Sequence, residues 1–195
     1  MMSEPWWPHV ASFFIALSTG ELLDSQTFFL LGYGFVPITI FVWSLALTDL
    51  LYEQQKKLIL GLAILFGLSM ESIFLYLLWT QPQYIGTVTG HFDVNYAPFM
   101  VFYQVILVII ILSNGTIFAL KSLKSPNPEV RLKGKLLLAA FYSFSLGGVL
   151  DIMSPFSLIT LIIARLLLFS SAFEFYGGFI LPRWMRSLFL RNERD

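Results

Sequence analysis

The stretch Ser157–Leu181, SLITLIIARLLLFSSAFEFYGGFIL, decides the fold class, because it is long and apolar and yet contains Arg165 and Glu174. As a helix it would measure about 37 Å at ~1.5 Å per residue, enough to cross a hydrocarbon core of ~30 Å. A charged side chain near the middle of such a helix costs about 2.5–3.5 kcal/mol on insertion scales. We therefore expect Arg165 and Glu174 to face other helices of a membrane bundle.

The composition agrees with this interpretation. The chain of 195 residues is 57% hydrophobic and 12% charged, whereas soluble domains carry about 25% charged residues. The apolar residues form long blocks instead of amphipathic stripes, which indicates membrane spans. The sequence predicts an all-α, polytopic transmembrane helical bundle. The absence of cysteine excludes disulfides, thiolate metal sites and cysteine nucleophiles.

Five spans are predicted within one integral membrane domain that covers residues 1–195. Pro37, inside the first span, predicts a kink that neighbouring helices can tolerate. Pro126 and Pro128 exclude one continuous helix through the third and fourth spans. Segment 80–97 contains the loop signals Pro82, Gly86 and Gly90. The predicted spans cover about 27–51, 58–79, 98–120, 136–153 and 156–181.

The two ends of the chain are harder to assign. Trp6 and Trp7 suit a membrane–water interface, but the apolar run that follows, Val10–Leu17, is short. Segment 5–20 is expected to lie along the outer surface or to re-enter it as a half-span; in the alternative, it crosses as a sixth span. No basic segment precedes this run, so a cleaved signal peptide is not expected. The tail 182–195 predicts an amphipathic helix at the inner leaflet, either as a simple anchor or as a surface that binds a partner or lipid.

The basic residues set the expected orientation. Eleven of the twelve lysines and arginines fall on alternate connections: 52–57, 121–135 and the tail. The connections between them carry Glu4, Glu21, Asp24 and Asp93 instead. By the positive-inside rule, the basic loops and the C-terminus are expected in the cytoplasm of a cell whose plasma membrane holds the protein. The twelfth basic residue is Arg165.

Four polar residues form a candidate cluster in the outer half of the bundle. Counting ~1.5 Å per residue from the outer ends of their spans puts Glu71 about 12 Å deep, Arg165 about 15 Å and Gln104 about 9 Å. Asp151 lies just under the outer surface. Small residues precede each acid at four-residue spacing, as in Ala63–Gly67–Glu71 and Gly147–Asp151, which favours helix-packing faces. The cluster is predicted to be either an ion pair that fixes helix register or a site for an anionic or polar ligand, proton or ion.

A second candidate polar site lies in the inner half. Glu174 shares a small face of its helix with Ser170, Ser171 and Gly177, and Asp49 has a similar depth. The two carboxyls are a candidate shared-proton site. The alternative for Asp49 is a boundary residue near Glu53 and Lys56, and for Glu174 an interhelical hydrogen bond.

No motif indicates catalysis. Two histidines, His9 and His91, on the expected outer side are too few for stacked haem ligand pairs, and every lysine falls in an expected cytoplasmic loop, where it cannot hold a retinal Schiff base. The sequence contains no HExxH, GxSxG, P-loop or dinucleotide fingerprint. We expect no catalytic residue, no metal site, no cofactor and no nucleic-acid partner.

Three segments carry a resemblance: SLALTDLLY around Asp49, GHFDVNYAPF around Asp93 and FEFYGGFILPRW around Glu174. They resemble segments of uncharacterised archaeal multi-span membrane proteins, and the likeness covers most of the chain. That group implies a membrane fold and no activity or site residue. The layout is also similar to membrane input modules that precede signalling domains, an analogy at the level of fold.

These patterns lead to a functional hypothesis. We expect a non-enzymatic sensory or ligand-binding membrane module whose partners are the lipid bilayer and a protein partner or second copy. A third possibility is a purely structural subunit held by a protein partner, and the main alternative is a small transporter or channel subunit. Against that alternative, the sequence shows no clear internal repeat of the kind that many transporters have.

Overall fold

The computed structural model describes residues 6–21, 23–88, 94–152 and 158–190. The chain divides into two compact units, Met1–Tyr103 and Gln104–Asp195, with the boundary inside one long helix. The expected turn at 153–155, and His91 and Asp93 of the outer loop, lie outside the described residues.

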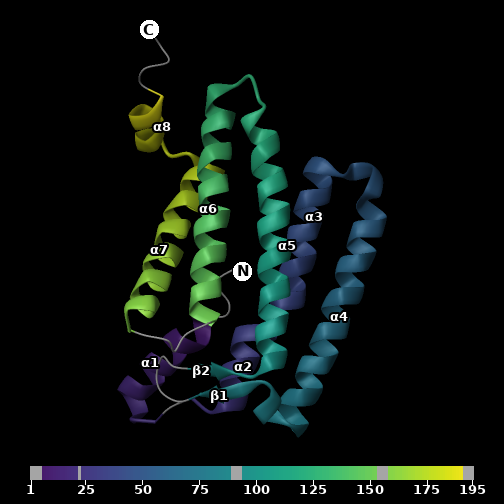
Figure 1. The fold of residues 1–195 in the computed structure, drawn as a ribbon, viewed down its shortest axis with the longest axis vertical. Helices are drawn as coiled ribbons and strands as arrows, with labels where there is room; N and C mark the ends of the chain where they lie inside the picture. The colour runs from purple at the N-terminus through teal and green to yellow at the C-terminus, as the bar shows by residue number, and fades with distance from the viewer. Residues whose placement is uncertain (1–5, 22, 89–93, 153–157, 191–195) are drawn as a thin grey trace. The chain divides into compact units, whose positions relative to one another are not determined.

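The first unit is built from helices α1 to α4 and a small hairpin (Figure 1). α1 covers Trp7–Thr19, and the first long apolar segment is divided into α2, Ser25–Tyr33, and α3, Val36–Leu51. A 3-10 turn, Glu53–Gln55, leads into α4, Lys56–Thr80, which packs against α3. A second 3-10 turn, Pro82–Tyr84, precedes strands β1, Gly86–Val88, and β2, Val94–Tyr96. The strands are antiparallel, with Thr87 opposite Asn95.

Aromatic side chains form the core of the first unit. The rings of Tyr33 and Phe74 are 6.1 Å apart between centroids, and Tyr33 and Tyr96 are 6.2 Å apart. Tyr96 therefore joins the hairpin to α2. His9 of α1 meets the ring of Phe28 edge to face at 5.1 Å, so α1 packs on α2 through its buried face.

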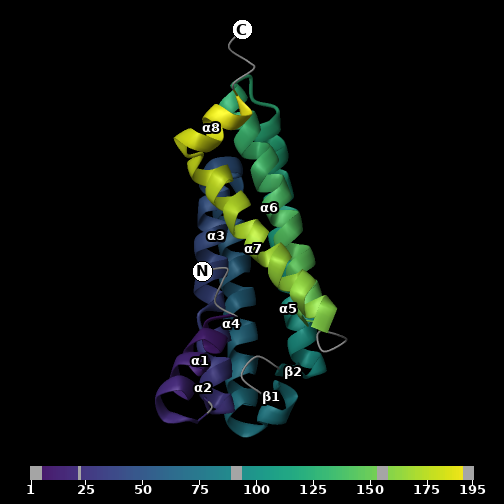
Figure 2. The same cartoon turned by 90° about the vertical axis from the view of Figure 1, so that its left-hand side faces the viewer.

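The second unit contains the rest of α5, Pro98–Leu123, followed by α6, Pro128–Ile152, α7, Leu158–Ile180, and the short α8, Arg183–Phe189. α6 and α7 pack along their length and cross obliquely, as Figure 2 shows. Phe141 of α6 is fully buried and meets Phe175 of α7 at a centroid distance of 5.0 Å. Glycines at the contact points bring the helices close together.

Among the described residues, five helical segments are long and apolar enough to cross a membrane, in agreement with the predicted five-span all-α bundle. They cover Ser25–Leu51, Glu53–Thr80, Pro98–Leu123, Pro128–Ile152 and Ile159–Ile180. Much of their apolar surface is exposed: on α4, for example, the side chains of Leu65 and Leu68 are 64% and 61% exposed. α1, with 13 residues, is shorter than the ~20 residues that a spanning helix needs.

Candidate functional site

The close approach of α6 and α7 positions the central pair of the site. A Cβ atom on Gly147 would lie 2.9 Å from the Cγ of Leu168 and 3.1 Å from the carbonyl oxygen of Ala164. Only a residue without a side chain allows this approach. Asp151 stands one helical turn beyond Gly147 on α6, and Arg165 directly follows Ala164 on α7. The glycine contact therefore brings these two charged residues together.

Asp151 and Arg165 form an ion pair. Nη2 of Arg165 lies 3.2 Å from Oδ1 of Asp151, and their side chains are 37% and 18% exposed. Arg165 stands six residues into the candidate span Ile159–Ile180, or about 9 Å along the helix. A guanidinium carries five N–H donors. One contact with one carboxylate oxygen leaves donors of Arg165 for a further acceptor.

The other two members of the predicted outer cluster are placed differently. Gln104 is buried in α5, with 7% of its surface exposed. Glu71 belongs to the first unit. Of the four predicted residues, Asp151 and Arg165 are joined by an ion pair within the second unit.

Glu71 lies level with an interruption in a neighbouring helix. The residues one turn before and after it on α4 both contact the junction of α2 and α3: a Cβ on Gly67 would be 3.2 Å from the Cβ of Pro37, and Phe74 packs on Tyr33. The junction itself is Gly34–Phe35. The half-buried side chain of Glu71 thus lies at the level where the first apolar segment is broken. Within the described residues, no hydrogen bond or ion pair involves its carboxyl.

The predicted kink at Pro37 is confirmed as this interruption. Proline lacks the backbone N–H that would continue the hydrogen-bond ladder of α2, so α3 begins anew with Pro37 in its first turn. The sequence predicted the kink at Pro37 and the depth of Glu71 separately and did not connect the two. Their position on facing helices was missed, although the Gly67–Glu71 spacing was the signal that could have found it.

The two members of the predicted inner site belong to different units. In the first unit, Asp49 forms an ion pair with Lys56 across the connection from α3 to α4, with Nζ of the lysine 2.5 Å from Oδ1. This contact agrees with the boundary role that the sequence left open for Asp49. In the second unit, Oε1 of Glu174 accepts a hydrogen bond of 2.9 Å from the hydroxyl of Ser170. The other carboxyl oxygen of Glu174 is buried and has no hydrogen-bond partner among the described residues.

Several polar contacts of the second unit were not foreseen from the sequence. Nζ of Lys133 donates to the carbonyl oxygen of Phe179 at 3.1 Å, where α7 is about to end. Arg186 of α8 forms an ion pair with Glu129 at the start of α6. The sequence presents Lys133 as an orientation signal and Arg186 as part of an amphipathic tail, and nothing in their spacing reveals which protein groups they bind.

Among the described residues, no group of three or more histidine, aspartate or glutamate side chains could hold a metal ion. Comparison of the chain with protein-family models, with curated proteins and with solved structures finds no match.

Proposed function

We propose that this protein is a multi-pass integral membrane protein that binds an anionic ligand at Arg165, as a non-enzymatic ligand-binding or sensory module. The single observation that carries the proposal is the ion pair that Arg165 of the apolar helix α7 forms with Asp151 of α6, with donors of the guanidinium left for another acceptor. The ligand class is a carboxylate or phosphate, presented by a small molecule or by a lipid headgroup.

Membrane residence is supported by the five apolar helices and by the apolar side chains that they expose. In water, surfaces of this kind would drive association. The alternation of basic and acidic connections favours basic loops in the cytoplasm of a plasma membrane.

Ligand binding is supported by the cost of leaving an arginine unsatisfied in an apolar environment. An intramembrane guanidinium is found paired or facing a polar cavity, because contact with lipid tails satisfies none of its donors. Asp151 neutralises the charge and fixes the orientation of the side chain. A planar guanidinium held in this way is suited to a second, bidentate contact with a carboxylate or phosphate.

The membrane part of the proposal is tested by fractionation and labelling. We expect the protein to stay in the membrane pellet after an alkaline carbonate wash. Because the chain has no cysteine, a single Lys57→Cys variant gives a unique thiol, which an impermeant maleimide should label in inside-out vesicles alone. Release by carbonate, or labelling of Lys57→Cys in intact cells, would contradict residence or orientation respectively.

The ligand part is tested by native mass spectrometry of protein released in mild detergent. The wild type should carry a stoichiometric adduct, Arg165→Gln should lose it, and the matched control Lys135→Gln should retain it. The adduct's mass separates a lipid from a small molecule. If Arg165→Gln lowers stability and leaves the adduct in place, the pair is structural and the ligand site lies elsewhere.

A second candidate function is transport of a proton or cation, which the position of Glu71 favours. Discontinuous helices at membrane depth are common sites of ion coordination in secondary transporters, and Glu71 lies on α4 between Gly67 and Phe74, which contact α3 and α2 on either side of the Gly34–Phe35 interruption. This candidate predicts uptake into proteoliposomes that Glu71→Gln abolishes and Glu21→Gln does not. Vesicles without uptake at acidic and neutral pH would count against it.

A further inference from the structure

We propose that α8 and the adjoining ends of α6 and α7 form a binding surface for the headgroup of an anionic phospholipid. The proposal rests on the membrane residence argued above and concerns residues remote in sequence from Arg165. The basic part of the surface is Lys133, Arg183 and Arg186, and its apolar part is Trp184 and Leu188.

The backbone turns sharply before α8. Leu181 has a φ of 49°, in the left-handed region, and its N–H donates to the carbonyl oxygen of Gly177 at 2.9 Å. Pro182 follows and cannot continue the helix. As a result, α8 leaves the direction of α7 and lies across it (Figure 2).

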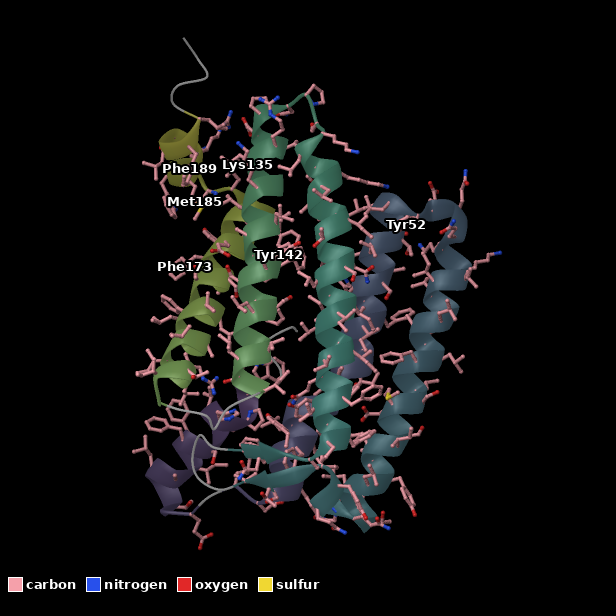
Figure 3. The ribbon with its side chains drawn as sticks, in the orientation of Figure 1. Tyr52, Lys135, Tyr142, Phe173, Met185 and Phe189 are labelled. Carbon is pink, nitrogen blue, oxygen red and sulfur yellow. The ribbon has the colours of Figure 1, made fainter. Side chains whose placement is uncertain are left out.

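Contacts with α6 and α7 hold α8 in this position. Met185 is buried, and its sulfur would be 2.6 Å from a Cβ on Gly177. It belongs to a small core with Leu132 and Leu181. Arg186 adds the ion pair with Glu129. The short helix is thereby held by the apolar packing of Met185 and by the ion pair of Arg186, and Figure 3 labels Met185 and Phe189 on it.

The charges of this surface are unbalanced. Lys133 donates a hydrogen bond to the carbonyl oxygen of Phe179 at the end of α7, and Arg186 forms an ion pair with Glu129. Arg183 is exposed. Three cations therefore stand against the single carboxylate of Glu129 in these contacts, which leaves a net positive surface that complements a phosphate.

The position of α8 along the chain places this surface at headgroup level. The last candidate span ends at Ile180, and α8 begins at Arg183. Trp184 and Leu188, one helical turn apart, are 57% and 67% exposed. An exposed tryptophan and leucine beside arginines are typical of a helix in the interfacial plane, where apolar side chains reach the acyl chains and cations bind phosphates.

The test uses the purified full-length chain in mild detergent, titrated with short-chain phosphatidylglycerol or phosphatidylcholine, with thermal unfolding as the readout. We expect phosphatidylglycerol to stabilise the wild type more than phosphatidylcholine does. Arg183→Gln should unfold like the wild type without lipid and bind phosphatidylglycerol about five-fold more weakly, the weakening expected for the loss of one basic residue at a membrane surface. Lys57→Gln, an exposed lysine of the first unit, is the matched control and should respond like the wild type.

Two further measurements distinguish stabilisation by a phospholipid from stabilisation by a free phosphate. Glycerol phosphate at the same concentration should not stabilise the protein, and Trp184→Ala should reduce the response to phosphatidylglycerol. Equal effects of the two lipids, an unchanged response of Arg183→Gln, or full stabilisation by glycerol phosphate would each overturn the proposal. Because Arg165→Gln tests the ligand site and the carbonate wash tests residence, failure of either is distinguishable from failure of this surface.

Discussion

The ring of Phe141 lies against Gly115 so closely that a Cβ atom on the glycine would be 2.3 Å from it. Phe141 is fully buried, so its ring has little room to move aside. α5 and α6 of the second unit therefore approach each other at a point where a small residue is required.

Replacing Gly115 with alanine should destabilise the protein by about 1–3 kcal/mol, the usual cost of overpacking a filled interior. The matched control is Gly61→Ala in α4, where an added Cβ meets nothing within 4 Å. That change should be neutral or stabilising by up to ~1 kcal/mol, because alanine favours the helix. Unfolding in detergent measures both. Equal losses in the two variants would show that Gly115 is not tightly packed.

The Arg165–Asp151 pair should show energetic coupling. Removing one partner leaves the other charged and poorly solvated, so Arg165→Gln and Asp151→Asn should each lower the free energy of unfolding. The double variant should lose less than the sum of the two single losses. Residues in contact commonly couple by about 0.5–3 kcal/mol. A double-mutant cycle of unfolding free energies measures this coupling. Strictly additive effects would mean that the contact contributes nothing to stability.

The long apolar blocks made the existence of the helices predictable. The exact ends of the helices were not predictable, because polar residues beside the apolar blocks belong to the helices or cap them. The fourth predicted span began at residue 136, whereas α6 begins at Pro128. Arg131, Lys133 and Lys135 extend the helix beyond its apolar part, which hydropathy alone does not detect. Likewise, Asp24 caps α2, so this helix starts at Ser25, two residues before the predicted span.

The hairpin of the first unit gave no recognisable sequence signal. Its strands have three residues each, too few for an alternating pattern. Gly86 is needed because a Cβ there would be 2.6 Å from the carbonyl oxygen of Asn95. The sequence identified this glycine as a turn signal and could not show what it approaches.

For the candidate site, the depth of each charged residue along its helix was predictable, but which residue pairs with Arg165 was not. Counting residues placed Arg165 near both Glu71 and Asp151, and the structure pairs it with Asp151. The choice depends on the Gly147 crossing of α6 and α7, which fixes rotation as well as depth. Rotation about a helix axis follows from packing against a neighbour, and a single sequence does not identify that neighbour.

Asp24 should make stability depend on pH in acid. Its carboxylate accepts the N–H of Thr27 at 2.9 Å, and this backbone hydrogen bond, followed by one from the Thr27 side chain, lowers its pKa below the usual 3.8. Because the pKa of Asp24 is lower in the folded state, its carboxylate contributes fully to the free energy of unfolding above about pH 4. This contribution is lost as the pH falls through the pKa of the folded state.

The measurement compares the wild type with Asp24→Asn, which keeps a capping acceptor and does not titrate. The unfolding temperature of the wild type should fall toward that of the variant as the pH drops from about 5 to about 3. Asp24→Ala should cost ~1 kcal/mol at neutral pH through loss of the cap. A constant difference between wild type and Asp24→Asn over this range would contradict the assignment.

Met185→Ala should release α8 from α6 and α7. The buried methionine fills the space over Gly177, and full truncation of such a side chain costs about 2–5 kcal/mol. Trypsin should then cleave faster after Arg183 and Arg186. Leu188→Ala removes a side chain that is 67% exposed and should leave the cleavage rate unchanged; similar acceleration in both would argue against docking through Met185.

The left-handed Leu181 also limits how motion can pass along the chain. A continuous helix transmits twist and axial displacement like a stiff rod, but α7 stops at Ile180 and the backbone changes direction at Leu181 and Pro182. Torque on α7 therefore has no direct mechanical route into α8. It must pass through side-chain contacts, namely the packing of Met185 on Gly177 and the ion pair of Arg186 with Glu129. Because Glu129 belongs to the start of α6, that part of α6 takes part in any such linkage.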